Sequence, residues 1–347
     1  MMQQPNATIV ADSRFGRREW NRMILGHFIE HFHTQIYGGL YEPGSPRADA
    51  NGFRTDVVGA LKELRVPIMR WPGGNYVSDH HWYEAVGKDR IPSYNKAWRV
   101  EEPNTFGTDE FIKWCEAVGC KPYICTNGVN GTSEEMANWV EYCNGHRDTR
   151  YARWRRENGS AEPFAVKYWG IGNESYGDWQ IGAKTVGEWG PYVAESAKMM
   201  RAVDDKIVLS AAAVPDTEWT LKLLQSAGRY LDLVSIHGYW DASHQVDEPK
   251  DYMTCMMRAE EPGEMIDRTR WVIGAAGYPA RSRLPSTSGT CAAGITRTEL
   301  TRRWWMHATR TTSPPRTRWQ TQYSPPASSM PAYATLTLSP WPTSRRR

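Results

Sequence analysis

Hydrophobic residues in the first 280 positions form short continuous runs that alternate with segments of helical spacing. The runs are rich in β-branched and aromatic residues, which is typical of buried strands. They predict strands at 23–30, 66–70, 121–126, 165–171, 207–213 and 231–236. Apolar residues at helical spacing predict helices at 55–64, 108–118, 133–144, 184–203, 217–227 and 251–273.

Strands that alternate with helices indicate a parallel sheet. Six strand–helix units fit residues 20–275, at a spacing close to that of an eightfold barrel of about 250 residues. We therefore predict an α/β fold, a (β/α)8 TIM barrel that is incomplete as written, over residues 20–280. A doubly wound open sheet is the alternative, although no glycine-rich phosphate loop follows any of the strands.

Polar residues recur where the predicted strands end. In (β/α) barrels this edge carries the active site. The stretch AVKYWGIGNESYGDWQ at 165–180 leads from a strand into Asn173 and Glu174. An isolated GNE motif also fits a glutamate at the surface. Because polar residues recur at the strand ends, we favour an active site in which Glu174 is a buried proton donor with a raised pKa. The full set is Glu30, Asn75, Asn127, Asn173, Glu174, His237 and Tyr239.

Composition narrows the class of ligand. The chain contains 17 tryptophans, and aromatic planes stack well on the C–H faces of sugar rings. Its six cysteines show neither CxxC pairs nor metal-ligand spacing, so we expect them to be reduced and mostly buried, with no metal or cofactor. The N-terminus shows no signal peptide and no run of 18 apolar residues occurs, which predicts a cytoplasmic protein without a membrane partner.

Six sequence motifs carry a family resemblance between residues 26 and 277. They are FIEH with IYGGLYEP, RWPGGNYVSDHHW, NTFGTDEFIKWCEAVG, EEMANWVEYCN, VKYWGIGNESYGDWQIG and SIHGYW. Together they resemble the retaining α-L-arabinofuranosidases of glycoside hydrolase family 51, which combine a barrel with a β-sandwich. The resemblance implies release of terminal non-reducing α-L-arabinofuranosyl residues from hemicellulose or pectin fragments. It also implies that a strand at 7–11, within an arm at 1–19, belongs to an otherwise missing sandwich, and that homo-oligomers such as hexamers are formed.

The resemblance also implies roles for individual residues. Glu174 would be the general acid/base, and Asn173 would hold the region of the sugar 2-hydroxyl. Trp98 would offer a platform on the aglycone side, although for Trp98 and His237 a packed core position is the alternative. Arg70 would support the site by ion pairing. The implied substrate-binding residues are Glu30, Asn75, Asn173, His237, Tyr239 and Trp98.

The second carboxylate of the reaction is missing from the sequence. A retaining glycosidase needs two carboxyl groups about 5 Å apart, one as acid/base and one as nucleophile. Glu30 is the other carboxylate at a strand end, but in the family this residue binds substrate. The nucleophile belongs to a motif like FDEWN on the seventh strand, and the 347 residues contain no such motif.

Residues 281–347 differ in composition from the rest. They contain 11 arginines, no lysine and one acid, Glu299, whereas residues 1–280 carry 31 basic and 38 acidic residues. Threonine, serine, proline and arginine dominate, and helical and strand periods vanish. One interpretation is a disordered, solvated tail. A basic arm that binds nucleic acid is another, but we expect no nucleic-acid partner.

A third interpretation of this tail is a change of reading frame. Residues 284–291 can be back-translated as CTG CCT TCG ACG AGT GGA ACC TGC. Read from the last base of the first codon, these bases encode Ala-Phe-Asp-Glu-Trp-Asn-Leu, the missing nucleophile motif. Its glutamate codon spans Thr287 and Ser288, and the same offset from residue 322 permits a helix followed by a strand. We interpret 281–347 as out of frame, which leaves the barrel with two open edges and the chain inactive. An endo-glucanase of similar barrel and a non-catalytic carbohydrate-binding protein remain alternatives.

Overall fold

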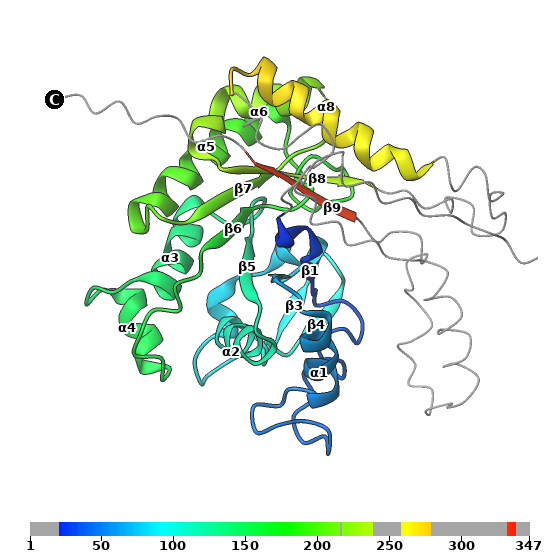
Figure 1. Cartoon of the computed structure of the whole chain (residues 1–347). Coiled ribbons are helices and arrows are strands. Elements are labelled where there is room, and N and C mark those ends of the chain that lie inside the picture. The colour runs from blue at the N-terminus through cyan, green and yellow to red at the C-terminus, as the bar shows by residue number, and fades with distance from the viewer. Residues whose placement is uncertain (1–20, 216, 239–257, 279–331, 338–347) are drawn as a thin grey trace, which may run out of the picture.

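A computed structural model describes residues 21–215, 217–238, 258–278 and 332–337. Its main sheet has the order β1-β2-β5-β6-β7-β8-β9 and curls as a half-barrel (Figure 1). The first six of these strands are parallel and follow chain order without reversal, which confirms the incomplete barrel over the doubly wound sheet. The strands are β1 (His27–Phe28), β2 (Ile68–Trp71), β5 (Lys121–Thr126), β6 (Tyr168–Ile171), β7 (Val208–Ala212), β8 (Leu233–Gly238) and β9 (Ala332–Thr337).

The predicted helices are present with similar boundaries. Helix α3 packs against α5, α5 against α6 and α6 against α8, so they form a layer outside the sheet (Figure 1). The helices are α1 (Thr55–Leu64), α2 (Thr108–Val118), α3 (Ser133–Asn144), α5 (Val186–Val203), α6 (Thr217–Ala227) and α8 (Glu261–Ala275). Residues 251–257 of the last predicted helix lie outside the described part of the chain.

Three predicted strand boundaries are wrong. In the first segment, Arg22–Leu25 forms a 3-10 helix, η2, whose start is capped by the Asn21 side chain, and only His27–Phe28 pairs with β2. The fourth predicted strand begins at Tyr168 because Ala165 has a left-handed φ of 53°. The last extends to Gly238, which places His237 inside β8 rather than after it.

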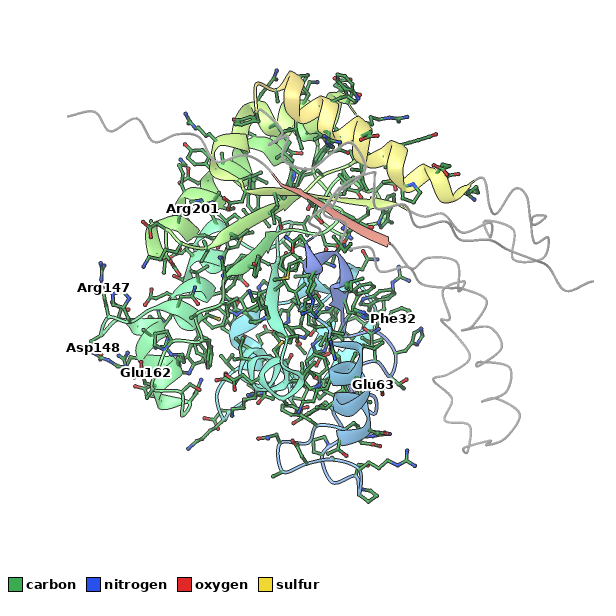
Figure 2. The ribbon with its side chains drawn as sticks, viewed as in Figure 1. Phe32, Glu63, Arg147, Asp148, Glu162 and Arg201 are labelled. Atoms are coloured by element: carbon green, nitrogen blue, oxygen red, sulfur yellow. The ribbon has the colours of Figure 1, made fainter. Side chains whose placement is uncertain are left out.

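Helix α4 (Arg150–Glu157) and the hairpin β3 (Ser93–Asn95)–β4 (Val100–Glu102) were not predicted. The sequence of α4, RYARWRRE, lacks an apolar stripe. Helix α4 is held instead by Arg155. The side chain of Arg155 is fully buried and donates to the carbonyl oxygens of Tyr142, Gly145 and Ser160. Figure 2 shows the neighbouring Asp148 at the outer rim of the protein, where it forms ion pairs with two arginines of α4.

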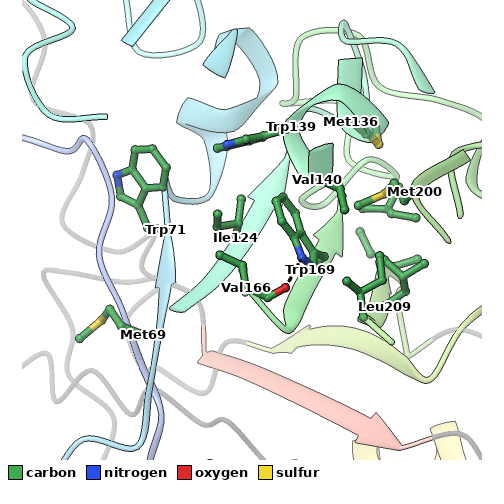
Figure 3. Packing of buried hydrophobic residues seen from close by; sticks show 14 of the residues in the cluster. Met69, Trp71, Ile124, Met136, Trp139, Val140, Val166, Trp169, Met200 and Leu209 are labelled. Carbon is green, nitrogen blue, oxygen red and sulfur yellow. Dashed lines mark hydrogen bonds between the residues drawn. The ribbon is translucent and has the colours of Figure 1, made fainter. Parts of the chain in front are cut away.

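The two faces of the sheet differ in chemistry. The strand register places Trp71, Ile124, Trp169 and Leu209 side by side on the helix-facing side, where Trp139 of α3 contacts both tryptophans at ring centroid distances of 6.0 Å (Figure 3). Because side chains alternate along a strand, the intervening residues, among them Arg70, Cys125 and Ser210, face the other way. The apolar core therefore lies outside the sheet and polar residues line its inner face.

Strand β9 pairs with β8 antiparallel, from Leu233 opposite Thr337 to Gly238 opposite Ala332. This corrects the expectation that both edges of the sheet are open, because β9 covers the edge of β8. Within the described residues, no strand covers the outer edge of β1. The predictions for the arm at 1–19, the strand at 7–11 and the rest of 281–347, including Thr287 and Ser288, lie outside the described residues.

Candidate active site

Glu174 lies at the carboxyl edge of the sheet, directly after β6, as the sequence predicts. The turn that presents it has positive φ at Gly172 (71°) and at Glu174 itself (44°). A Cβ atom at Gly172 would lie 2.6 Å from both Ser175 Oγ and the Trp189 ring, so this turn requires glycine. The Glu174 side chain is buried, with 5% of the residue exposed.

Two ring N–H groups contact the Glu174 carboxylate. Nδ1 of His237 lies 2.8 Å from Oε1, and Nε1 of Trp179 donates to Oε2 at 2.9 Å. Burial lowers the pKa of His237, so its imidazole is neutral at neutral pH. Because a carboxylate oxygen can only accept, the single ring hydrogen is on Nδ1, and Nε2 faces Ser235 Oγ at 3.4 Å.

The pKa of Glu174 is the main correction to the sequence-based site. Burial raises it, but the hydrogen bonds from His237 and Trp179 and the charge of Arg70 outweigh burial and bring the pKa below its ordinary value. The expectation of a raised pKa is therefore wrong for this chain. A second carboxylate about 5 Å away, as in a complete retaining site, would push this pKa upward.

Arg70 and Asn173 form the centre of the inner face. Nη2 of Arg70 donates to Asn173 Oδ1 at 2.8 Å and to Cys125 Sγ at 3.2 Å. The positive charge of Arg70 also lowers the pKa of both Glu30 and Glu174. Arg70 was predicted to support the site by ion pairing; here it donates to an amide and a thiol, and its charge acts on two carboxyl groups.

Glu30 lies in the loop after β1, where the charge of Arg70 also acts on it. Its Oε1 accepts from the backbone N–H of Tyr76 and from Trp98 Nε1, both at 3.1 Å. Burial raises the pKa of Glu30 above its ordinary value despite these hydrogen bonds. Gly73 has φ 139°, and a Cβ atom there would lie 2.2 Å from Glu30 Cγ, so Gly73 makes room for this side chain.

The Trp98 indole is half-buried and packs at 4.7 Å, between ring centroids, from Phe32, which Figure 2 labels in the loop after β1. The sequence predicts an aglycone platform at Trp98, and its indole N–H in fact binds Glu30. Asn75 begins the 3-10 helix η3 (Asn75–Asp79), and its Oδ1 is buried without a hydrogen-bond partner. Such an acceptor is suited to a ligand hydroxyl group.

The Asn127 side chain accepts from the backbone N–H groups of Val129 and Asn130, and it donates to the His80 carbonyl at 3.3 Å. It therefore connects its own loop to the segment after β2. Tyr239 lies outside the described residues. Trp179 was missed, although it stands within the quoted 165–180 stretch, because only the folded loop shows that its indole reaches Glu174.

Within the described residues, no three His, Cys, Asp or Glu side chains form a group that could hold a metal ion. None of the helices formed by the same residues is long and apolar enough to cross a membrane.

The chain forms a half-barrel of strand–helix units, and its carboxyl edge carries a buried glutamate and a polar face suited to a sugar. These features place the protein in the class of the barrel glycoside hydrolases. The family described as "Alpha-L-arabinofuranosidase 1 domain" matches residues 60–257. The chain belongs to the α-L-arabinofuranosidases of glycoside hydrolase family 51, which confirms the family resemblance of the sequence.

Individual relatives agree with this assignment. "Alpha-L-arabinofuranosidase C" of Emericella nidulans is 41% identical over 298 residues, which is 81% of this chain and 58% of that protein. "Intracellular exo-alpha-(1->5)-L-arabinofuranosidase" of Halalkalibacterium halodurans is 36% identical over 280 residues, 78% of this chain and 54% of that protein. The solved GH51 α-L-arabinofuranosidase of Thermotoga petrophila superposes with a TM-score of 0.63 at 40% identity, over 72% of this chain and 53% of that one. The chain thus spans about half the length of the curated relatives it matches.

Proposed function

We propose that this chain carries the acid/base half of an α-L-arabinofuranosidase that removes terminal non-reducing arabinofuranosyl residues from hemicellulose or pectin fragments. The buried Glu174, held at the carboxyl edge by an imidazole and an indole, is the observation that carries the proposal. The names of the relatives support the sugar class. A relative named intracellular supports a cytoplasmic location, and assembly of several copies is part of the proposal.

In this proposal each polar residue has a role in a double displacement. Glu174 protonates the leaving oxygen and later takes a proton from water. Asn173, Glu30, Asn75, His237 and Tyr239 contact the arabinose, and Trp98 lies toward the aglycone. The nucleophile is a glutamate that this reading frame does not encode, and its codon spans Thr287 and Ser288. Residues 1–19 are then an arm, 20–280 the partial catalytic barrel and 281–347 an out-of-frame tail.

The 347-residue chain is inactive in this proposal for two reasons. No glycosyl-enzyme intermediate forms without the nucleophile. In addition, the pKa of Glu174 is lowered, so its carboxyl group is charged at neutral pH and has no proton to give. Both defects trace to the same missing carboxylate, because that negative charge would raise the pKa of Glu174.

A substrate panel tests the sugar class. A gene repaired to one frame near codon 280 is expected to hydrolyse an aryl α-L-arabinofuranoside and to leave a β-glucan intact. Hydrolysis of the glucan instead would favour the endo-glucanase. Independent resequencing of codons 275–290 tests the frame itself, and an uninterrupted frame encoding STSGT would refute the frame change.

A second candidate, a non-catalytic carbohydrate-binding protein, is favoured by the surviving Glu30, Trp98 and Asn75 cluster. We expect arabinose to change the tryptophan fluorescence of the 347-residue chain and glucose to change it much less. Glu30→Gln serves as the matched variant, because it keeps the size of the side chain and removes the charge. If arabinose has no effect at any concentration, the pocket assignment is wrong.

A further inference from the structure

The two donors to the Glu174 carboxylate differ in how firmly they are held. His237, which binds Oε1, lies inside β8 with its side chain 2% exposed. Trp179, which binds Oε2, lies in the loop after β6 and is 58% exposed. Oε1 therefore faces the protein interior through a buried ring, whereas Oε2 faces outward beneath a side chain at the surface.

The loop that carries Trp179 is fixed at its backbone. The N–H of Gly177 donates to the Glu174 carbonyl at 2.8 Å, and the N–H of Gln180 donates to the Gly177 carbonyl at 3.0 Å. The Gln180 side chain is buried and accepts from Ser78 Oγ at 2.6 Å. Because Gly177 and Gln180 are both anchored, we expect Trp179 to move by rotation of its side chain rather than by displacement of the loop.

Gly177 determines where the indole can lie. A Cβ atom built on Gly177 would lie 2.4 Å from two atoms of the Trp179 ring. Any side chain at position 177 therefore forces the exposed indole away from its present position. The absence of a side chain at Gly177 is what permits the contact between Trp179 and Oε2.

An indole N–H is a donor only, and a donor favours the charged form of the carboxyl group that it contacts. While Trp179 binds Oε2, the hydrogen bond stabilises the unprotonated carboxylate and disfavours a proton on this oxygen. Among the charged or titratable groups of the described residues, His237, from β8, and Arg70, from β2, act on Glu174. Both are buried, whereas Trp179 is exposed.

We propose that Trp179 is a positioning residue that holds Glu174 in its unprotonated form, and that rotation of the indole off Oε2 removes a donor that disfavours a proton on this oxygen. The proposal rests on the proposed acid/base role of Glu174. In glycosidic cleavage, the nucleophile carboxylate of the proposed function bonds to the anomeric carbon, the glycosidic C–O bond breaks, and the proton on Oε2 passes to the leaving oxygen. The indole then binds the unprotonated Oε2. In the hydrolytic step, the indole leaves Oε2, water bonds to the anomeric carbon and its proton passes to Oε2, while the bond to the nucleophile breaks and its electron pair returns to that carboxylate.

The test follows the ionisation of Glu174 in the 347-residue chain without any sugar. In ¹³C-carboxyl-labelled protein, the glutamate signal that disappears in Glu174→Gln identifies Glu174. We expect its pKa to rise by about one unit in Trp179→Phe, the size expected for one hydrogen bond to a charged group. Gly177→Ala keeps the indole but displaces it, and the same rise is expected there.

Trp271→Phe is the matched control, because Trp271 is 80% exposed on α8 and its loss should leave the Glu174 pKa unchanged. In ¹⁵N-indole spectra, the Trp179 N–H signal should titrate together with Glu174 and cease to titrate in Glu174→Gln. An unchanged Glu174 pKa in both Trp179→Phe and Gly177→Ala overturns the proposal, as does an equal rise in Trp271→Phe. Because no substrate is involved, a pKa shift without sugar hydrolysis in the repaired protein would count against the proposed function alone.

Discussion

Gly73→Ala tests whether the position of Glu30 creates the sugar pocket. The new Cβ would lie 2.2 Å from Glu30 Cγ and 2.7 Å from Cδ, so Glu30 must leave its contacts with the Tyr76 N–H and Trp98 Nε1. Losing one charge-assisted contact to a sugar hydroxyl costs about 1.5–3 kcal/mol, which weakens arabinose binding by about 10- to 150-fold. The φ of 139° adds backbone strain of about 1–3 kcal/mol to the folded state.

Gly119→Ala separates strain from displacement. Gly119 also has positive φ, 83°, but a Cβ atom there has no neighbour within 4 Å. Both variants should lower the free energy of unfolding in urea, and Gly73→Ala alone should weaken arabinose binding in a fluorescence titration of the 347-residue chain. Equal arabinose affinity in the two variants would refute the reasoning that Gly73 places Glu30 in the pocket.

Two further predictions concern stability. Burial lowers the pKa of His80 well below its ordinary value of 6.5, so below that pH the unfolded chain binds a proton at His80 that the folded chain does not. The free energy of unfolding should therefore decrease on acidification, and less steeply in His80→Phe. Equal slopes for the two proteins in thermal melts across this pH range would contradict the assignment. Trp139 Nε1 donates to Thr108 Oγ1 at 3.0 Å in the core, so Thr108→Val should lower the free energy of unfolding in urea by about 1–3 kcal/mol. Thr108→Ser, which keeps the hydroxyl group, should retain most of the stability of the parent. A valine variant as stable as the parent would show that the bond contributes nothing.

The sequence was most informative where local pattern and burial agree. Apolar runs predicted β2, β5 and β7 because their side chains are buried on the helix-facing side of the sheet, as Trp71, Ile124 and Leu209 are. The pattern failed for α4, whose anchor is a buried arginine, Arg155, rather than an apolar stripe. It also overstated β1, where an asparagine cap turns the first residues into a 3-10 helix.

The candidate site also has a part that local sequence predicts and a part that only the folded structure shows. Strand-end position and family motif predicted that Glu30, Asn173 and Glu174 lie near one edge of the sheet, because parallel strands bring their ends to one edge. The role of Trp179 and the lowered pKa of Glu174 depend on contacts across a loop and between strands, which no spacing along the chain encodes. The sign of a pKa shift is set by the balance of burial against donors, so a buried position alone does not predict it.

The most direct test of the central claim, that Glu174 is one half of a catalytic pair whose other half lies in another frame, is the rate of aryl α-L-arabinofuranoside hydrolysis. We predict no turnover by the 347-residue chain and clear turnover by the frame-repaired protein. For a substrate with a poor leaving group, Glu174→Ala in the repaired protein should lower the rate by about 10²- to 10⁴-fold. Equal rates for the 347-residue and repaired proteins, or a repaired protein indifferent to the loss of Glu174, would contradict the account.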